Sequence, residues 1–211
     1  MITFEANESL HRAAFTTRFP RPLGEWGEER PWESFTAAAA SAPVERSEDV
    51  RKAVRALLRE GGHKPSGRGK PSSEYLVRAV EEGTLPAINL AVDVCNLVSW
   101  QSGLPMSVVD LERAEAPLAV RLGGAEDEYV FNASGQTIRL AGLLCLWDAA
   151  GPCANAVKDS HRTKTGEATL ETCTVIWGPA SHAEQVERAT AWSIELLGAA
   201  GAEAKALRSR E

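Results

Sequence analysis

The stretch INLAVDVCNLVSWQSGLPMSVVD, residues 88–110, decides the fold of this 211-residue chain. Its apolar residues recur at three-, four- and seven-residue spacings and cover most of the circumference of a helix, which predicts a helix buried on several sides. Gly103 ends this helix, and Pro105 prevents it from continuing. The chain then re-enters the fold through residues 106–110.

A polar stripe crosses this otherwise apolar helix, because Asp93, Asn96 and Ser99 follow one another at every third position. A buried polar group without a partner costs about 1–3 kcal/mol. Each of these side chains must therefore brace the backbone of a neighbouring loop or face a ligand pocket. Ser107 and Asp110 follow the Gly-Leu-Pro turn, so the polar residues on its two sides can converge on one place.

Composition predicts one globular domain. The chain is 44% hydrophobic and 25% charged, and 211 residues suffice to bury a substantial core. It has no apolar run long enough to span a membrane, and its acidic N-terminus lacks the apolar core of a secretion signal. Four cysteines without paired short spacing favour a reducing cytoplasm over a disulfide framework. We therefore expect a cytoplasmic protein with no membrane partner.

The net charge of −6 argues against a general nucleic-acid coat protein and against a DNA partner. Any RNA contact must come from a local basic patch. The segment GGHKPSGRGKPSS, residues 61–73, is such a patch, since it holds His63, Lys64, Arg68 and Lys70 and no acidic residue. Its glycines allow a close backbone approach to phosphates. It is either a mobile surface loop or an RNA contact, and it lacks the phosphate-loop motif of nucleotide-binding proteins.

The remaining pattern predicts an α+β fold: a mixed or antiparallel sheet or sandwich core with packed helices. Helices are expected at 47–59, 73–82 and 180–200, and strands at 2–4, 13–19, 118–122, 128–131, 137–140, 143–147 and 172–177. We expect a single domain over 1–211. Residues 1–45 form an N-terminal extension of strands and loop, 46–200 the core, and 201–211 a frayed charged tail.

Residues 147–165 have little helical or strand period yet are rich in reactive side chains, including Asp159, His161, Arg162 and Thr163. Long irregular segments in compact domains are often functional. Cys153 and His161 lack the spacing of a zinc site or a cysteine nucleophile, so we expect no metal and no cofactor. The alternatives are purely structural roles: a loop-bracing ion pair for Asp159 and Arg162, and capping or turn-bracing for Asp93 and Asp110.

The ordered set DVCNLVS (93–99), GLPMSVVDL (103–111), KPSSEYLVRAV (70–80) and KDSHRTKT (158–165) resembles free-standing proteins of the B3/B4 domain family. Two of these segments, DVCNLVS and GLPMSVVDL, are also similar to the editing module in the beta chain of bacterial phenylalanyl-tRNA synthetase. The resemblance covers residues 68–178. The synthetase module has a histidine where this chain has Ser107, a threonine at Cys95, and an acidic residue near His161. The pocket that rejects tyrosine is therefore not carried over intact.

The resemblance implies a trans-acting aminoacyl-tRNA editing protein, a deacylase with its site between the central helix and residues 147–165. The implied catalytic residues are Asp159, His161 and Arg162. Substrate binding is expected from Asn96, Ser99, Ser107, Asp110 and Thr163, and contact with the tRNA acceptor end from His63, Lys64, Arg68 and Lys70. The alternatives are a non-catalytic module that binds tRNA or an amino-acid-like ligand, and a hydrolase of small esters or amides. The oligomeric state and the amino acid stay open.

Overall fold

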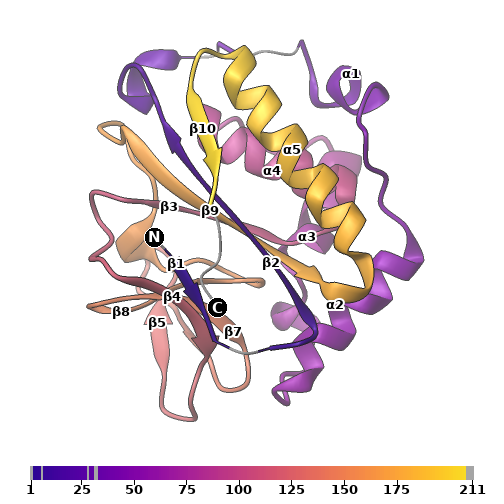
Figure 1. Cartoon of the computed structure of the whole chain (residues 1–211), viewed down its shortest axis with the longest axis vertical. Coiled ribbons are helices and arrows are strands. Elements are labelled where there is room, and N and C mark those ends of the chain that lie inside the picture. The colour runs from indigo at the N-terminus through magenta and orange to yellow at the C-terminus, as the bar shows by residue number, and fades with distance from the viewer. Residues whose placement is uncertain (1, 6, 28, 31–32, 208–211) are drawn as a thin grey trace.

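The computed structural model describes residues 2–5, 7–27, 29–30 and 33–207, which form two four-stranded sheets and one two-stranded sheet, β5-β6, flanked by helices (Figure 1). The strands are β1 (Ile2–Phe4), β2 (Leu10–Arg18), β3 (Met106–Asp110), β4 (Leu118–Leu122), β5 (Glu128–Val130), β6 (Thr137–Arg139), β7 (Leu144–Asp148), β8 (Gly151–Asn155), β9 (Glu171–Pro179) and β10 (Glu203–Ala206). The helices are α1 (Phe35–Ala40), α2 (Glu48–Glu60), α3 (Ser72–Glu81), α4 (Leu90–Ser102) and α5 (Ala183–Ala199). Short 3-10 turns are η1 (Leu23–Trp26), η2 (Gly67–Gly69), η3 (His161–Thr163) and η4 (Ala180–His182).

The first sheet has the order β10-β2-β9-β3 and is antiparallel throughout. β2 and β9 pair over all nine of their residues, and Phe15, Val175 and Trp177 are buried there. α5 contacts β2 and β9 and α4 contacts β3, so the two helices cover this sheet (Figure 1). The second sheet, β1-β4-β7-β8, is mixed, because β1 runs parallel to β4. The predicted α+β class is confirmed.

α4 is the buried helix that the sequence predicts. The side chain of Asn89 accepts a hydrogen bond from the N–H of Val92 and caps the first turn. Gly103 ends the helix in the left-handed conformation, with φ of 75°, which glycine adopts at no steric cost. The side chain of Ser99 donates to the carbonyl of Leu104 (2.7 Å), which fixes the turn that leads into β3.

Three sequence expectations need correction. β1 and β2 lie in the two four-stranded sheets, so these strands of the expected N-terminal extension belong to the core. Within the expected frayed tail, Glu203–Ala206 is a strand paired with β2, and 208–211 lie outside the described residues. Within the expected irregular segment, Gly151–Asn155 is strand β8, paired with β7. The backbone pairing of these strands stabilises them without an alternating apolar pattern.

Two contacts connect the first sheet and its helices to the second sheet. β3 contacts β8, which brings the strand after α4 beside the end of the second sheet. Gly61, at the end of α2, lies against Gly142, the residue two before β7: a Cβ on Gly61 would come within 2.2 Å of the Gly142 carbonyl oxygen. In the described part of the chain, no helix has the length and apolar character needed to cross a membrane.

Candidate functional site

A cleft of about 1280 Å³ lies between three walls. One wall comes from the segment after α2 and from α3, the second from α4 and β3, and the third from β6 and the segment after β8. The apolar lining residues are Leu76, Ile88, Val92, Cys95, Met106, Val108, Phe131, Ile138 and Val157. The cleft is therefore large enough for a small organic group and apolar over much of its surface.

Asp159 is the only carboxylate among the described residues that line the cleft. Its side chain is half-buried, and its Oδ1 accepts a hydrogen bond from the hydroxyl of Ser107 (2.7 Å). Burial raises the pKa of Asp159 to about 7, although Ser107, the charge of Lys164 and nearby backbone N–H groups favour the ionised form. A carboxyl with this pKa exchanges its proton near neutral pH.

Ser107 connects Asp159 to the core of the first sheet. Its hydroxyl oxygen accepts the indole N–H of Trp177 (2.9 Å) and lies 3.1 Å from the carbonyl oxygen of Asn155. Both Ser107 and Trp177 are almost fully buried. When Asp159 is ionised, Ser107 donates its proton to it; when Asp159 is protonated, it can donate to Ser107, which then donates to Asn155. The hydrogen bonds are satisfied in both protonation states.

Cationic side chains surround the mouth of the cleft. Arg68, Arg139 and Lys164 are exposed, and Lys158 is half-buried. The amine of Lys158 lies 3.9 Å from the centre of the Phe131 ring, and that of Lys164 donates to the Phe131 carbonyl (2.7 Å). Burial and the charge of Arg68 both lower the pKa of Lys158. Within the described ranges, none of these four cations forms an ion pair with a carboxylate.

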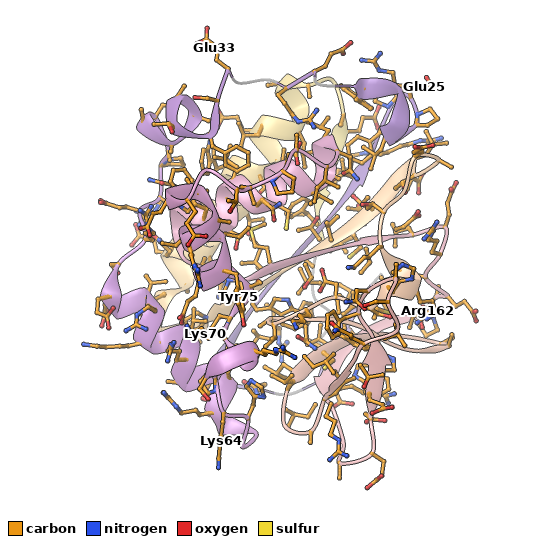
Figure 2. The ribbon with its side chains drawn as sticks, turned by 180° about the vertical axis from the view of Figure 1, so that it is seen from behind. Glu25, Glu33, Lys64, Lys70, Tyr75 and Arg162 are labelled. Carbon is orange, nitrogen blue, oxygen red and sulfur yellow. The ribbon has the colours of Figure 1, made fainter. Side chains whose placement is uncertain are left out.

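The basic segment forms one wall of the cleft and is folded on itself. His63 donates from Nε2 to the carbonyl of Gly69 (2.9 Å), and the hydroxyl of Tyr75 donates to Gly67 (2.8 Å). Of the four basic residues singled out from the sequence, His63 and Arg68 line the cleft and Lys64 and Lys70 do not. Figure 2 shows Lys64 pointing away from the body of the molecule.

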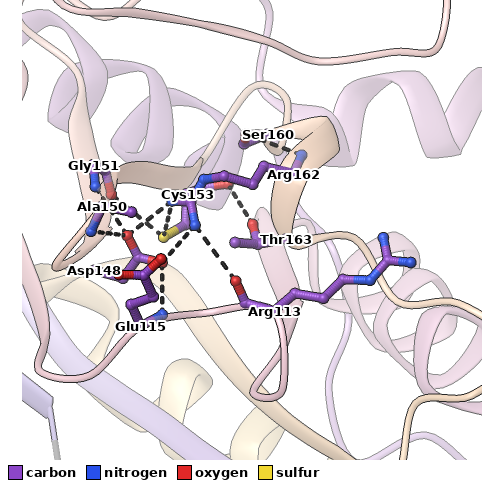
Figure 3. A network of polar contacts seen from close by, with 9 residues as sticks. All are labelled: Arg113, Glu115, Asp148, Ala150, Gly151, Cys153, Ser160, Arg162 and Thr163. Carbon is purple, nitrogen blue, oxygen red and sulfur yellow. Dashed lines mark hydrogen bonds and ion pairs between the residues drawn. The ribbon is translucent and has the colours of Figure 1, made fainter.

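The structure separates Arg162 and His161 from Asp159. Both line a shallow depression formed with β5 and the β7–β8 turn, and neither lines the cleft. Arg162 makes a two-pronged ion pair with Asp148 (2.7 and 2.8 Å), drawn in Figure 3, and Figure 2 places it across the view from Tyr75. The structure therefore does not bring the three residues together in the cleft, and the guanidinium of Arg162 forms a loop-bracing ion pair.

Asp148 shows why this pair is structural. Its side chain is fully buried and also accepts N–H groups of Glu115, Ala150 and Gly151. Burial alone would raise the pKa of Asp148, but the hydrogen bonds from Arg162 and the backbone outweigh burial and hold it below its usual range. The pair thus fixes the turn between β7 and β8, from which residues 155–159 continue into the cleft.

Most of the remaining predicted residues brace the backbone. The carboxylate of Asp110 accepts the N–H of Glu112 (2.9 Å) and the hydroxyl of Thr169 (2.6 Å), and Thr163 donates to the carbonyl of Cys153 (3.3 Å). Ser99 holds the turn after α4, as described above. Asn96 alone of the helical stripe lines the cleft. Among the expected substrate-binding residues, Asn96 reaches the cleft and Ser107 reaches Asp159.

Several cleft residues carry no sequence signal of their own. Arg139, Phe131 and Lys164 come from the β5–β6 hairpin and the segment after η3, and only the fold brings them together. Asn155 has a second role: its Oδ1 accepts the N–H groups of Val157 (2.7 Å) and Lys158 (3.0 Å), which shapes the turn before Asp159. An asparagine followed by a short irregular segment is typical of such turns, and this signal can be found in the sequence.

The four cysteines are free and buried. Burial raises the pKa of Cys153 and of Cys173 to about 12 and that of Cys95 higher still, so these thiols stay protonated and are poor nucleophiles. Among the residues that the structure describes, no three His, Cys, Asp or Glu side chains are grouped to hold a metal ion.

Comparison with known proteins gives two kinds of match. Residues 64–187, more than half of the chain, match the B3/4 domain. No curated protein sequence matches. An N-terminal fragment of the phenylalanyl-tRNA synthetase beta-subunit from Pyrococcus horikoshii is similar over 99% of this chain and 51% of that one, with a TM-score of 0.52 and 8% identity. A TILS C-terminal domain matches 36% of this chain and 71% of that one, with a TM-score of 0.32 and 17% identity.

The chain thus spans about half the length of the synthetase fragment. At 8% identity this likeness shows the fold alone.

Proposed function

This chain belongs to the B3/4 domain family, and from that membership and the shape of its cleft we propose that it hydrolyses, in trans, the ester of a mischarged aminoacyl-tRNA. The observation that carries the proposal is the cleft itself, which joins a cationic mouth to an apolar interior with one carboxyl. A 3′-terminal aminoacyl ester has matching parts: phosphates, an apolar or polar side chain, and a reactive carbonyl.

The cationic mouth supports binding of the RNA end. Arg68, Arg139 and Lys164 are exposed there and carry no carboxylate partner within the described part of the chain, so their charge is available to phosphates. Tyr75 is 40% exposed and Ile88 58% exposed, and both line the cleft. Exposed aromatic and aliphatic side chains beside cations are the combination on which unpaired bases stack.

The interior supports the chemistry. An aminoacyl ester is already activated, so a positioned water and stabilisation of the developing oxyanion suffice. In the reaction the water oxygen attacks the ester carbon, the bond to the ribose oxygen breaks, and the proton passes to that oxygen. Asp159 and the amide of Asn96 line the interior, where they can orient the ester and the water. His161 and Arg162 are not part of this proposal, because they lie outside the cleft.

A second candidate is a non-catalytic module that binds tRNA or an amino-acid-like ligand. It is favoured by the position of His161 and Arg162, since their absence from the cleft leaves few described groups there that can take part in proton transfer. The two candidates share the cleft and its cationic mouth, and differ only in turnover.

A panel of mischarged tRNAs tests the proposal. We expect the purified protein to release one amino acid, or a small set, faster than the ester hydrolyses by itself, and to bind the cognate tRNA. Binding without release across the panel would favour the second candidate. Neither binding nor release would contradict both.

A further inference from the structure

The charges of the cleft are unequally placed. Four cations, Arg68, Arg139, Lys158 and Lys164, and the imidazole of His63 lie on its walls, against the single carboxylate of Asp159 among the described lining residues. The three exposed cations lie towards solvent, whereas Asp159 is half-buried and hydrogen-bonded to the buried Ser107. A ligand that matches this arrangement is anionic at its outer end and cationic at its inner end.

Within the part of the chain that the structure describes, Asp159 forms no ion pair with a cation. Lys164, whose charge acts on Asp159 from a distance, donates a hydrogen bond to the carbonyl of Phe131. The direct side-chain donor to the carboxylate is the neutral hydroxyl of Ser107. A half-buried carboxylate without a counter-ion is costly, so a cation brought by the ligand would be stabilised at this position.

An aminoacyl ester brings such a cation. Its α-amino group is separated from the ester carbonyl by one carbon atom, so an ester held in the cleft carries a positive charge next to the reacting bond. A free α-amino group has a pKa of about 8. It is therefore largely protonated at neutral pH, where Asp159 is partly ionised.

We propose that Asp159 is the counter-ion for the free α-ammonium group of the bound aminoacyl ester, so that the site accepts esters of free amino acids and rejects those whose amino group is acylated. The inference rests on the proposed function and deepens it, because it assigns the carboxylate to recognition of the substrate class. An N-acylated ester presents a neutral amide to Asp159, which leaves the carboxylate desolvated without a counter-ion and adds the bulk of the acyl group.

Binding of stable analogues tests this without turnover. The probes are L-aminoacyl amides of 3′-amino-3′-deoxyadenosine, one for each proteinogenic amino acid, each prepared with a free and with an acetylated amino group. Their affinities are measured by calorimetry at pH 7.5 for the wild-type chain, Asp159→Asn and Glu126→Gln. Glu126 is exposed and outside the cleft, so Glu126→Gln removes the same charge elsewhere.

We expect at least one free-amine probe to bind the wild-type chain about tenfold or more tightly than its acetylated twin, as a charge-assisted hydrogen bond provides. Asp159→Asn should reduce this preference to below about twofold while keeping the affinity for the acetylated twin, which also reports that the variant is folded. Glu126→Gln should keep the preference.

Three results would overturn the inference. If the wild-type chain binds each free-amine probe and its acetylated twin equally well, the role of Asp159 as counter-ion is contradicted, but the proposed deacylase is not. The same holds for a preference that survives in Asp159→Asn, because another group would then recognise the ammonium. If no probe binds in either form and the tRNA panel shows no release, both the inference and the proposed function are contradicted.

Discussion

At the scale of single residues, the proposed function depends most on Asp159. Sequence reasoning selects it from its place in the DSHRT run, but cannot separate it from His161 and Arg162, which lie within three residues of it. The two residues differ in environment: Asp159 lines the cleft, whereas Arg162 is bound to Asp148 outside it. The partner of a charged side chain depends on strands far away in the sequence, so a local pattern cannot supply it.

The stability of the protein should depend on pH through Asp159. Folding raises its pKa from 3.8 to about 7. Between these values the folded protein holds a proton that the unfolded chain has released, so the contribution of Asp159 to the free energy of unfolding falls as pH rises from about 4 to 7. Asp159→Asn does not ionise. Relative to the wild-type chain it should gain roughly 2–4 kcal/mol between pH 4.5 and 8, measured by urea unfolding.

Ser107 and Lys164 face Asp159, together with Cys95, Tyr129 and Cys145. Burial is the main cause that raises the pKa values of these last three groups, so they stay protonated from pH 4.5 to 8 in both proteins. A stability difference that is constant from pH 4.5 to 8 would show that Asp159 titrates as an ordinary exposed carboxyl.

Arg162→Ala should destabilise the fold without weakening the cleft. It leaves the carboxylate of Asp148, which is fully buried, with backbone donors only. We expect a loss of about 2–3 kcal/mol at pH 7. Because the pKa of Asp148 is held below its usual range, the loss should shrink as pH falls below about 4 and the carboxyl becomes protonated. Arg162→Lys, which keeps the charge but not the two-pronged geometry, should lose less.

The check is urea unfolding beside binding of the free-amine probe. Our interpretation of Arg162 would be wrong if the variant kept its stability and lost the probe.

At the scale of elements, helices were the easier part to predict. α2 and α4 have capping residues, and α2, α4 and α5 have apolar residues at helical spacing; the structure confirms all three helices to within a few residues. β8 and β10 were missed for a physical reason. β8 contains Gly151 and Pro152, and β10 is a short edge strand with exposed side chains, so neither has the alternation that marks a half-buried strand.

The contact between Gly61 and Gly142 should be sensitive to a single methyl group. It connects the end of α2, and with it the basic wall of the cleft, to the turn before β7. Gly61→Ala should cost about 1–3 kcal/mol through backbone displacement and weaken the free-amine probe. Gly198→Ala is the matched change: its Cβ meets no atom within 4 Å inside α5, and it should stabilise by about 0.5–1 kcal/mol.

Thermal unfolding and calorimetry on the two variants provide the measurement. Equal effects of the two substitutions, or a stable Gly61→Ala with unchanged affinity, would show that this contact does not position the wall.

At the scale of the whole molecule, the net charge and the charge at the mouth of the cleft have opposite signs. The chain carries −6 overall, yet the mouth of the cleft is cationic. Binding of tRNA should therefore weaken steeply with salt, and Arg68→Ala should lower the slope of log affinity against log salt by about one. Lys64→Ala, from the same segment but outside the cleft lining, should change the slope less. Filter binding from low to physiological salt measures both.

An equal change for the two variants would mean that the entire basic segment contacts RNA, as its composition alone predicts. No change for Arg68→Ala would place the RNA on another face.

The measurement that tests the central claim most directly is single-turnover release of amino acid from the mischarged-tRNA panel by the wild-type chain, Asp159→Asn and Arg162→Ala. We predict release of at least one amino acid faster than spontaneous ester hydrolysis, slowed about tenfold or more in Asp159→Asn and nearly unchanged in Arg162→Ala at a temperature where it is folded. Release that survives in Asp159→Asn but not in folded Arg162→Ala would contradict the site described here. No release from any tRNA would contradict the deacylase itself.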